Sequence, residues 1–456
     1  MKRLLQGGTV VSGTGAVRAD VLLRDERVEA VGRNLNCPEA EVVDVSGMLL
    51  LPGFVDAHTH FDLDVSNTTT ADDFATGSRA ALRGGTTTVV DFACPQKGQS
   101  LQYGLDLWHQ KARGKAACDY GFHMTIDDWS PAIAGELPAM IGQGVTSFKM
   151  YMIYPAMMLG DRDLYLALCQ LKDLGAVVGV HCENAGLIDA LQAQALAAGR
   201  MEPAAHPQTR PDVAEAEAVG RLLKLAQAAQ APVMIVHLSS AAGLAEVDAA
   251  RRRGQKVWVE TCPQYLCLDD SVYSLPGFQG ARYVCSPPLR KRADQDRLWR
   301  GLADGAVQTV CTDHCSFTLA QKDAGRGNFT KIPGGMPGVE TRGLLLYDRG
   351  VAAGRISLET MVQVLCEHPA KLYGLWGRKG AIAPGFDGDL VVFDPQGRTV
   401  ITAADSAGAA DYAPLEGYEA AGSIRQVYLR GQLVVEAGRL VAEPEGRYLR
   451  RELGWL

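Results

Sequence analysis

The chain has 456 residues, with 45 Lys or Arg against 52 Asp or Glu, which makes its formal net charge -7 at pH 7. This acidic balance excludes the basic footprint of a nucleic-acid-binding protein and the basic patch of a membrane-surface protein. No apolar run approaches the ~20 residues of a membrane helix. We therefore expect a small molecule as the partner, with no nucleic acid and no membrane.

The cysteines favour a cytoplasmic location. There are eleven, scattered from Cys37 to Cys366, and they form no paired CxxC framework. An odd number of unpaired cysteines is typical of reduced thiols in a reducing compartment. The first residues, "MKRLLQGGTVV", contain glycines that break any signal-peptide apolar segment.

The first fifty residues alternate short β-rich pieces with turns, and their period of two predicts an antiparallel meander. The same pattern of short β-rich pieces and turns returns at residues 380–395 and 424–441. Two β-rich ends around a different middle predict one small β-sandwich domain, built from residues 1–52 and 376–440. Residues 441–456 form an arginine-rich tail, for which both a solvated segment and, from the family resemblance described below, an oligomer contact stay open.

The middle of the chain, residues 53–375, alternates apolar β-branched runs with amphipathic helical stretches such as 72–85, 161–176 and 211–230. The predicted strands are "FVDAHTH", "TTTVVDF", "YGFHMTI", "TSFKMYM", "AVVGVHCEN", "PVMIVHLS", "KVWVETCP" and "QTVCTDHC". Eight alternations predict an α/β fold with a parallel (β/α)8 TIM barrel.

The active site of such a barrel lies at the carboxyl ends of its strands, so the residues there carry the functional prediction. His58 and His60 end the first strand and, two residues apart, point the same way. Imidazole and carboxylate ligands suit zinc and similar divalent ions. The predicted metal ligands are His58, His60, Lys149, His181, His237 and Asp313.

Lys149 lies between Phe148 and Met150 on the predicted fourth strand, where it should be buried. Burial lowers a lysine pKa and leaves a free amine, which carbon dioxide converts into a carbamate able to bridge two metals. The alternative is a lysine paired with a core carboxylate. Acids at other strand ends, Asp91, Asp127 and Glu260, complete no ligand cluster that the sequence reveals.

This set of residues resembles the binuclear-metal amidohydrolase superfamily. The segments "PGFVDAHTHF", "GGTTTVVDF", "SFKMYM", "VHLS", "ETCPQYL", "SPPLR" and "TDHC" look like those of the hydantoinase/dihydropyrimidinase family, from Gly7 to about Asp394. The resemblance implies a hydrolase of cyclic C–N bonds. It would open 5-substituted hydantoins such as phenylhydantoin, or dihydropyrimidines, to N-carbamoyl amino acids, and assemble as a homotetramer or homodimer.

The resemblance also assigns the ligands. His58, His60 and Asp313 would hold one divalent ion, and His181 and His237 the other; zinc is expected for both. N6-carboxylated Lys149 and a hydroxide would bridge them. Asp313 would accept the proton of the hydroxide and pass it to the leaving ring nitrogen.

Substrate contacts follow from the same resemblance. Tyr154 would donate to the developing oxyanion, with loop packing as its alternative role. Ser286 in "CSPPLR" would bind the imide edge of the ring, opposite a turn that reads "KIPGGMPG", with Gly334 where the family usually has asparagine. Apolar residues of the loops after strands one and four would meet the 5-substituent, although a plain core role is equally consistent; they are Phe61, Val65, Met152 and Leu159.

Three alternatives stay open. A dihydroorotase usually has arginine two residues after the HxH pair, whereas Asp62 here would repel a carboxylate substrate. An allantoinase acts on a neutral hydantoin and is not excluded by charge. A non-catalytic hydantoinase-like scaffold is disfavoured because all six ligand types are present. No GxGxxG opens a βαβ unit near the start, which argues against an oxidoreductase.

Overall fold

The computed structural model describes residues 2–65 and 68–454, and its largest unit is a parallel barrel. All eight predicted strands are confirmed, and each pairs with its neighbour in chain order. They are β8 (Phe54–Thr59), β11 (Thr86–Ala93), β12 (Asp119–Thr125), β13 (Ser147–Tyr151), β14 (Val177–His181), β15 (Val233–Ile235), β16 (Val257–Thr261) and β17 (Thr309–Val310). Residues after β17 close the barrel, since Thr312 donates backbone N–H and hydroxyl to the Asp56 carboxylate at 3.1 and 2.7 Å.

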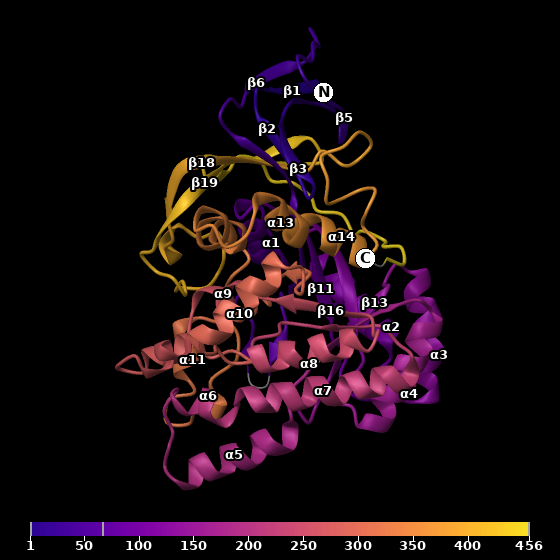
Figure 1. Ribbon diagram of the computed structural model, residues 1–456, viewed down its shortest axis with the longest axis vertical. Coiled ribbons are helices and arrows are strands. Elements are labelled where there is room, and N and C mark those ends of the chain that lie inside the picture. The colour runs from indigo at the N-terminus through magenta and orange to yellow at the C-terminus, as the bar shows by residue number, and fades with distance from the viewer. Residues whose placement is uncertain (1, 66–67, 455–456) are drawn as a thin grey trace.

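Helices lie around and beside the barrel and include the three predicted helical stretches (Figure 1). The main ones are α1 (Phe74–Arg83), α2 (Leu101–Ala112), α3 (Pro131–Gly142), α4 (Asp161–Asp173), α5 (Ala185–Ala197), α7 (Asp212–Ala229), α8 (Ala241–Arg252) and α10 (Arg292–Ala303). Local sequence sets where they begin: Asp73, for example, caps α1 by accepting from Ala75 and Thr76 N–H at 2.9 Å each. Within residues 2–65 and 68–454, no helix is both long and apolar enough to span a bilayer.

Short elements fill the loops at the carboxyl ends of the strands and the segment after the barrel. The loops contain β9 (Asp64–Val65), β10 (Thr68–Thr69), α6 (Ala205–Thr209), α9 (Pro263–Cys267), η1 (Asp270–Ser274), η2 (Gln279–Tyr283), α11 (Leu319–Asp323) and η3 (Phe329–Lys331). The helical segment after them consists of α12 (Arg342–Leu346), η4 (Tyr347–Ala352), α13 (Leu358–Val362), η5 (Gln363–Glu367) and α14 (His368–Leu372).

A β-sandwich is built from both ends of the chain, as the sequence predicts. One sheet has the order β5-β4-β1-β6 and the other β21-β20-β19-β18-β7-β2-β3. Their bounds are β1 (Lys2–Gln6), β2 (Thr9–Ser12), β3 (Gly15–Arg18), β4 (Asp20–Arg24), β5 (Arg27–Gly32), β6 (Glu41–Asp44), β7 (Leu49–Pro52), β18 (Leu390–Val400), β19 (Glu419–Leu429), β20 (Gln432–Glu436) and β21 (Arg439–Leu440), with η6 (Ala403–Asp405) between β18 and β19. In Figure 1 the indigo N-terminal strands and the yellow β18 and β19 lie together, beyond one end of the barrel. Apolar residues of both sheets, such as Leu5, Leu50 and Val392, share one core.

The antiparallel meander predicted for the first fifty residues is wrong in part. The pairs β1–β4, β4–β5 and β2–β3 are antiparallel, but β6 lies parallel to β1 and β7 lies parallel to β2. The chain moves between the two sheets instead of turning back beside itself each time. Strands that are not consecutive thereby become neighbours, and a parallel pair needs such a crossover.

The described part of the C-terminal tail packs on the amino-terminal end of its own barrel. Leu449 N–H donates to Tyr120 O at 2.7 Å. Arg451 is 4% exposed and donates to Ser147 Oγ at 2.8 Å and to Phe122 O. Residues 455–456 lie outside the described chain, and the predicted oligomer contact of the tail stays a prediction.

Candidate metal centre

The fold brings the six predicted ligands together at the carboxyl ends of the barrel strands. Asp313 Oδ1 lies 3.2 Å from His58 Nε2 and 3.1 Å from His60 Nε2. Lys149 Nζ lies 3.4 Å from His58 Nε2. On the other side, the ring centroids of His58 and His237 are 5.3 Å apart, and those of His237 and His181 are 4.6 Å apart.

The donor atoms fit metal ions. One ligand atom from each of His58, His60 and Asp313 lies within 4.8 Å of the others. The Nδ1 atoms of His60 and His237 are buried and have no hydrogen-bond partner among the described residues. Such a cluster of imidazoles and a carboxylate suits zinc and similar ions, and its unpaired buried nitrogens need a ligand. The role of the six as metal ligands stays a prediction.

Electrostatics favours the protonation states that ligands need at Lys149, His60 and Asp313, whereas Glu260 and Asp313 outweigh burial at His58 and raise its pKa. Burial lowers the pKa of Lys149 to about 8, and no carboxylate of the described chain forms an ion pair with it. Burial also lowers the pKa of His60, to about 4, so its imidazole is neutral at pH 7. Burial raises the pKa of Asp313, but the imidazoles of His58 and His60 more than offset this, so its carboxyl is ionised.

Two glutamates that the sequence analysis does not assign orient the histidines. Glu260 Oε1 lies 2.5 Å from His58 Nδ1 and accepts from His237 backbone N–H at 3.1 Å. Glu183 Oε2 lies 2.8 Å from His181 Nε2. A carboxylate on the far nitrogen fixes the tautomer and orientation of a metal-binding imidazole. The signals available in the sequence were the position of Glu260 at a strand end and the spacing of Glu183 two residues after His181.

We expect Glu260→Gln to weaken metal affinity by roughly 10- to 100-fold, because the amide cannot supply the charge that holds His58. Titration of the metal-free protein with zinc measures this. Glu215→Gln is a matched control, since Glu215 is equally buried but accepts from Ser239 backbone N–H and hydroxyl and holds no imidazole. Equal affinities for both variants would contradict the orienting role of Glu260.

Three residues of the site adopt left-handed backbone conformations. The φ angles are 51° for Asp313, 39° for His237 and 72° for Tyr154. Non-glycine residues rarely adopt positive φ, and such strain persists only where the surrounding structure enforces it. The chain therefore bends sharply at the point where each of these side chains turns into the site.

Tyr154 lies beside the cluster, with its ring centroid 5.3 Å from that of His181. Burial raises the pKa of its hydroxyl, and the nearby Arg210 and Ser286 side chains offset this only in part, so the phenol keeps its proton at neutral pH. Ser286 and Gly334 face one another, because a Cβ placed on Gly334 would lie 3.6 Å from Ser286 Oγ. Tyr154, Ser286 and Gly334 thus lie in one region, and their contact with substrate stays a prediction.

The predicted pocket residues differ in their surroundings. Phe61 is fully buried, with its ring 5.6 Å from Phe74 and 5.4 Å from His314, which is the plain core role. Met152 and Leu159 are 4% and 7% exposed and belong to the same apolar core. Val65 is half-buried on β9. A contact of any of the four with substrate stays a prediction.

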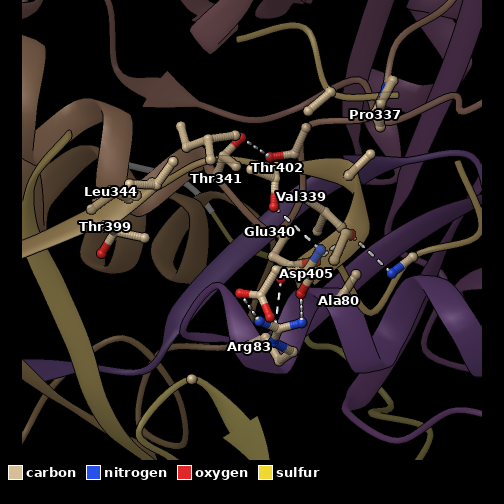
Figure 2. Close-up of a pocket in the computed structure, with 18 of the residues that line it drawn as sticks. Ala80, Arg83, Pro337, Val339, Glu340, Thr341, Leu344, Thr399, Thr402 and Asp405 are labelled. Atoms are coloured by element: carbon tan, nitrogen blue, oxygen red, sulfur yellow. Dashed lines mark hydrogen bonds and ion pairs between the residues drawn. The ribbon is translucent and has the colours of Figure 1, made fainter. Parts of the chain in front are cut away.

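A cavity of about 400 Å³ lies elsewhere, between α1, residues 337–344 and the β18–β19 pair. None of the six predicted ligands is among its lining residues in the described chain. Figure 2 shows Arg83 in its wall, where Arg83 Nε lies 3.3 Å from Glu340 and Arg83 Nη2 lies 3.1 Å from Asp405. The Arg83–Asp405 ion pair joins the barrel to the segment between β18 and β19. The cavity lies apart from the six predicted ligands, although its lining includes His314, the neighbour of Asp313.

A (β/α)8 barrel with this cluster at its strand ends and a β-sandwich from both termini defines a class of barrel hydrolases. The chain belongs to the amidohydrolase family, whose sequence model matches residues 49–434.

Similar proteins of known name cover the whole chain. A D-hydantoinase of Geobacillus stearothermophilus is 44% identical over 99% of this chain and 97% of its own length. A D-phenylhydantoinase of Escherichia coli is 42% identical over 99% of this chain and 98% of its own length. The crystal structure of dihydropyrimidinase from Brevibacillus agri is 43% identical, covers 100% of both chains and superposes with a TM-score of 0.98.

Proposed function

We propose that the protein is a cyclic amidohydrolase that opens the ring amide of hydantoins or dihydropyrimidines to give N-carbamoyl amino acids. The observation that carries this proposal is the convergence of His58, His60 and Asp313 in one buried cluster. The full-length similarity to a D-hydantoinase and to a dihydropyrimidinase structure supports the same reaction.

The proposal includes two divalent ions, with zinc as the expected metal. His58, His60 and Asp313 would hold one and His181 and His237 the other, with carboxylated Lys149 between them. When bound, two such ions acidify a shared water and polarise a carbonyl oxygen. The lowered pKa of Lys149, about 8, supports carboxylation because far more of its amine is unprotonated near neutral pH than in an ordinary lysine.

Residues of the chain then perform the remaining tasks. Water adds to the ring carbonyl carbon, and Asp313 takes its proton and delivers it to the ring nitrogen as the C–N bond breaks. The Tyr154 hydroxyl donates a hydrogen bond to the developing oxyanion, an interaction worth roughly 3 kcal/mol. Ser286 and the backbone around Gly334 hold the imide edge, so that the carbonyl is presented to the cluster.

A first experiment separates this function from its alternatives. We expect elemental analysis to find about two metal ions per chain, as a two-metal hydrolytic site requires. Assays on hydantoin, phenylhydantoin, dihydrouracil and allantoin should show turnover of a hydantoin or of dihydrouracil, and a chelator should remove it. Turnover of allantoin alone would favour the allantoinase. Absence of both metal and turnover, even after reconstitution with zinc and bicarbonate, would favour the scaffold.

The assembly and location are also proposals. We infer a homotetramer or homodimer from the family resemblance, which light scattering of the purified protein tests directly. The location proposed is the cytoplasm. All eleven cysteines are free thiols, which supports a reducing compartment.

A further inference from the structure

We propose that Lys322 is a positioning residue that fixes the two loops bearing Ser286 and Gly334, and thereby holds the imide edge of the substrate. The inference rests on the proposed function, because it assigns a task to the loops that would bind the ring. Lys322 itself lies outside the cluster and touches none of the six predicted ligands by hydrogen bond or ion pair among the described residues.

The Lys322 ammonium donates to three backbone carbonyls. Its acceptors are Val284 O at 2.9 Å, Pro333 O at 2.7 Å and Gly335 O at 2.7 Å. An ammonium has three N–H donors, so its hydrogen-bonding capacity is fully used. The residue is 1% exposed, so the donors are shielded from bulk solvent.

These acceptors belong to the two loops that face one another across the proposed imide site. Val284 precedes Ser286 by two residues, while Pro333 and Gly335 flank Gly334 on either side. Gly335 N–H also donates to Val284 O at 2.9 Å. One ammonium therefore joins both loops at the point where they meet.

The turn at Gly334 contains two consecutive glycines and is held by contacts with other segments, which include the Gly335 N–H bond to Val284 O and the bond from Cys315 N–H to Met336 O at 3.2 Å. Gly334 carries no side chain, and Gly335 has a φ of 150° with its ideal Cβ position only 2.3 Å from Cys315 O. Consecutive glycines are conformationally permissive, so external anchors are needed to order them. Lys322 is one such anchor, because it binds the carbonyls on both sides of Gly334.

Lys379 is a second buried lysine, and its partners differ in kind from those of Lys322. Lys379 is also 1% exposed, but two carboxylates, Asp119 and Asp389, each lie 2.7 Å from its Nζ. Lys322 has no ion-pair partner in residues 2–65 and 68–454, and burial lowers its pKa to about 7. Burying a lysine without a counter-ion is costly, and here the three carbonyls that shape the loops use its donors.

The helix that carries Lys322 is itself anchored. Thr318 caps α11, and the side-chain oxygen of Gln321 accepts from Thr318 backbone N–H at 2.7 Å. The amide nitrogen of Gln321 donates to Thr68 Oγ1 and Thr69 O, each at 2.7 Å. The α11 helix is therefore anchored to the β9–β10 hairpin through the residue that precedes Lys322.

The test replaces Lys322 with methionine, which keeps the apolar stem and removes the donors, and uses Lys379→Met as the matched control. Misplacing a bound substrate costs affinity and alignment, so we expect KM for hydantoin or dihydrouracil to rise roughly tenfold or more in Lys322→Met. The metal content should be unchanged, and kcat should stay within about threefold if ground-state binding is the main loss. Lys379→Met should lose thermal stability with no change in KM.

Hydrogen exchange measured by mass spectrometry gives a second readout that does not depend on activity. In Lys322→Met, the exchange rate should rise in peptides covering residues 284–289 and 331–336. In Lys379→Met, the same peptides should exchange as in the wild type. Lys322→Gln, whose amide retains two donors, should give intermediate values and serves if the methionine variant does not fold. An unchanged KM with unchanged exchange in a folded variant would overturn the proposal. A wild-type protein that opens no ring would overturn the proposed function, while the exchange data would still decide whether Lys322 orders the loops.

Discussion

Lys149→Met is expected to lower kcat/KM for ring opening by roughly 10³-fold, because the variant lacks the amine that would become the bridging ligand. Loss of about 4 kcal/mol of transition-state stabilisation, as two-metal catalysis supplies, corresponds to this factor. The metal content measured by elemental analysis should fall from about two ions per chain to one or fewer. The kcat/KM of the variant and of the wild type should be measured on dihydrouracil or hydantoin with added zinc.

Methionine is a suitable replacement because the stem of Lys149 packs among apolar groups. Its Nζ lies 4.9 Å from the ring centroid of Phe92 and 5.1 Å from that of Tyr151, and the residue is 1% exposed. The fold should therefore persist, as circular dichroism and thermal unfolding can check. Labelling with ¹³C-bicarbonate should give a carbamate signal in the wild type that the variant lacks. A variant with two ions and wild-type turnover would refute the bridging role.

The barrel was predictable because each strand is a short, continuous run of β-branched and apolar residues between helical stretches. A strand buried on both faces has that signature, so β8 and β11 to β17 could be placed from local sequence alone. The pairing of β6 with β1 and of β7 with β2 could not. Local alternation predicts that a strand exists, but the partner of that strand depends on where the chain crosses between the two sheets.

The candidate ligands were predictable for a related reason: position at a strand end determines that a side chain faces the barrel mouth. Orienting residues were harder to identify. Glu260 binds His58 across 202 positions of sequence, and nothing local to either residue indicates that they meet. Lys322 lies in "LAQKDAGRG", which reads as an exposed helical turn, and only tertiary packing buries it.

Phe61 shows that proximity along the chain does not by itself decide where a side chain points. It follows His60 directly, which suggests a place in the substrate pocket. Asp91 accepts the Phe61 backbone N–H at 2.9 Å, and Asp62 has a φ of 51°, so the chain turns there. The phenyl ring consequently points into the core against Phe74.

Asp313→Asn is expected to lower kcat by roughly 10³-fold, within the range for loss of a general acid–base group. Asparagine has nearly the same shape, and its amide oxygen retains one possible ligand atom, but it accepts no proton at neutral pH. The two proposed roles of Asp313 therefore respond differently to added metal. If Asp313 only holds the ion, saturating zinc should restore kcat; if it also moves the proton, kcat should stay low when two ions are bound.

Asp72→Asn is the matched control for this experiment. Asp72 is fully buried, and its carboxylate lies 3.0 Å from Nε2 of His314, the residue after Asp313. The other partners of the carboxylate are Ser316 Oγ and Ala409 N–H, and none of its hydrogen bonds in the described chain is to a predicted ligand. His314 Nδ1 in turn accepts from Gly338 and Val339 N–H, so this histidine braces the loop and makes no hydrogen bond to Asp313 among the described residues. The control should lose stability and keep kcat within about tenfold, since it disturbs the support of the loop and removes no proton acceptor. Equal losses of kcat in both variants would mean that the loop geometry, and not the carboxylate of Asp313, limits the reaction.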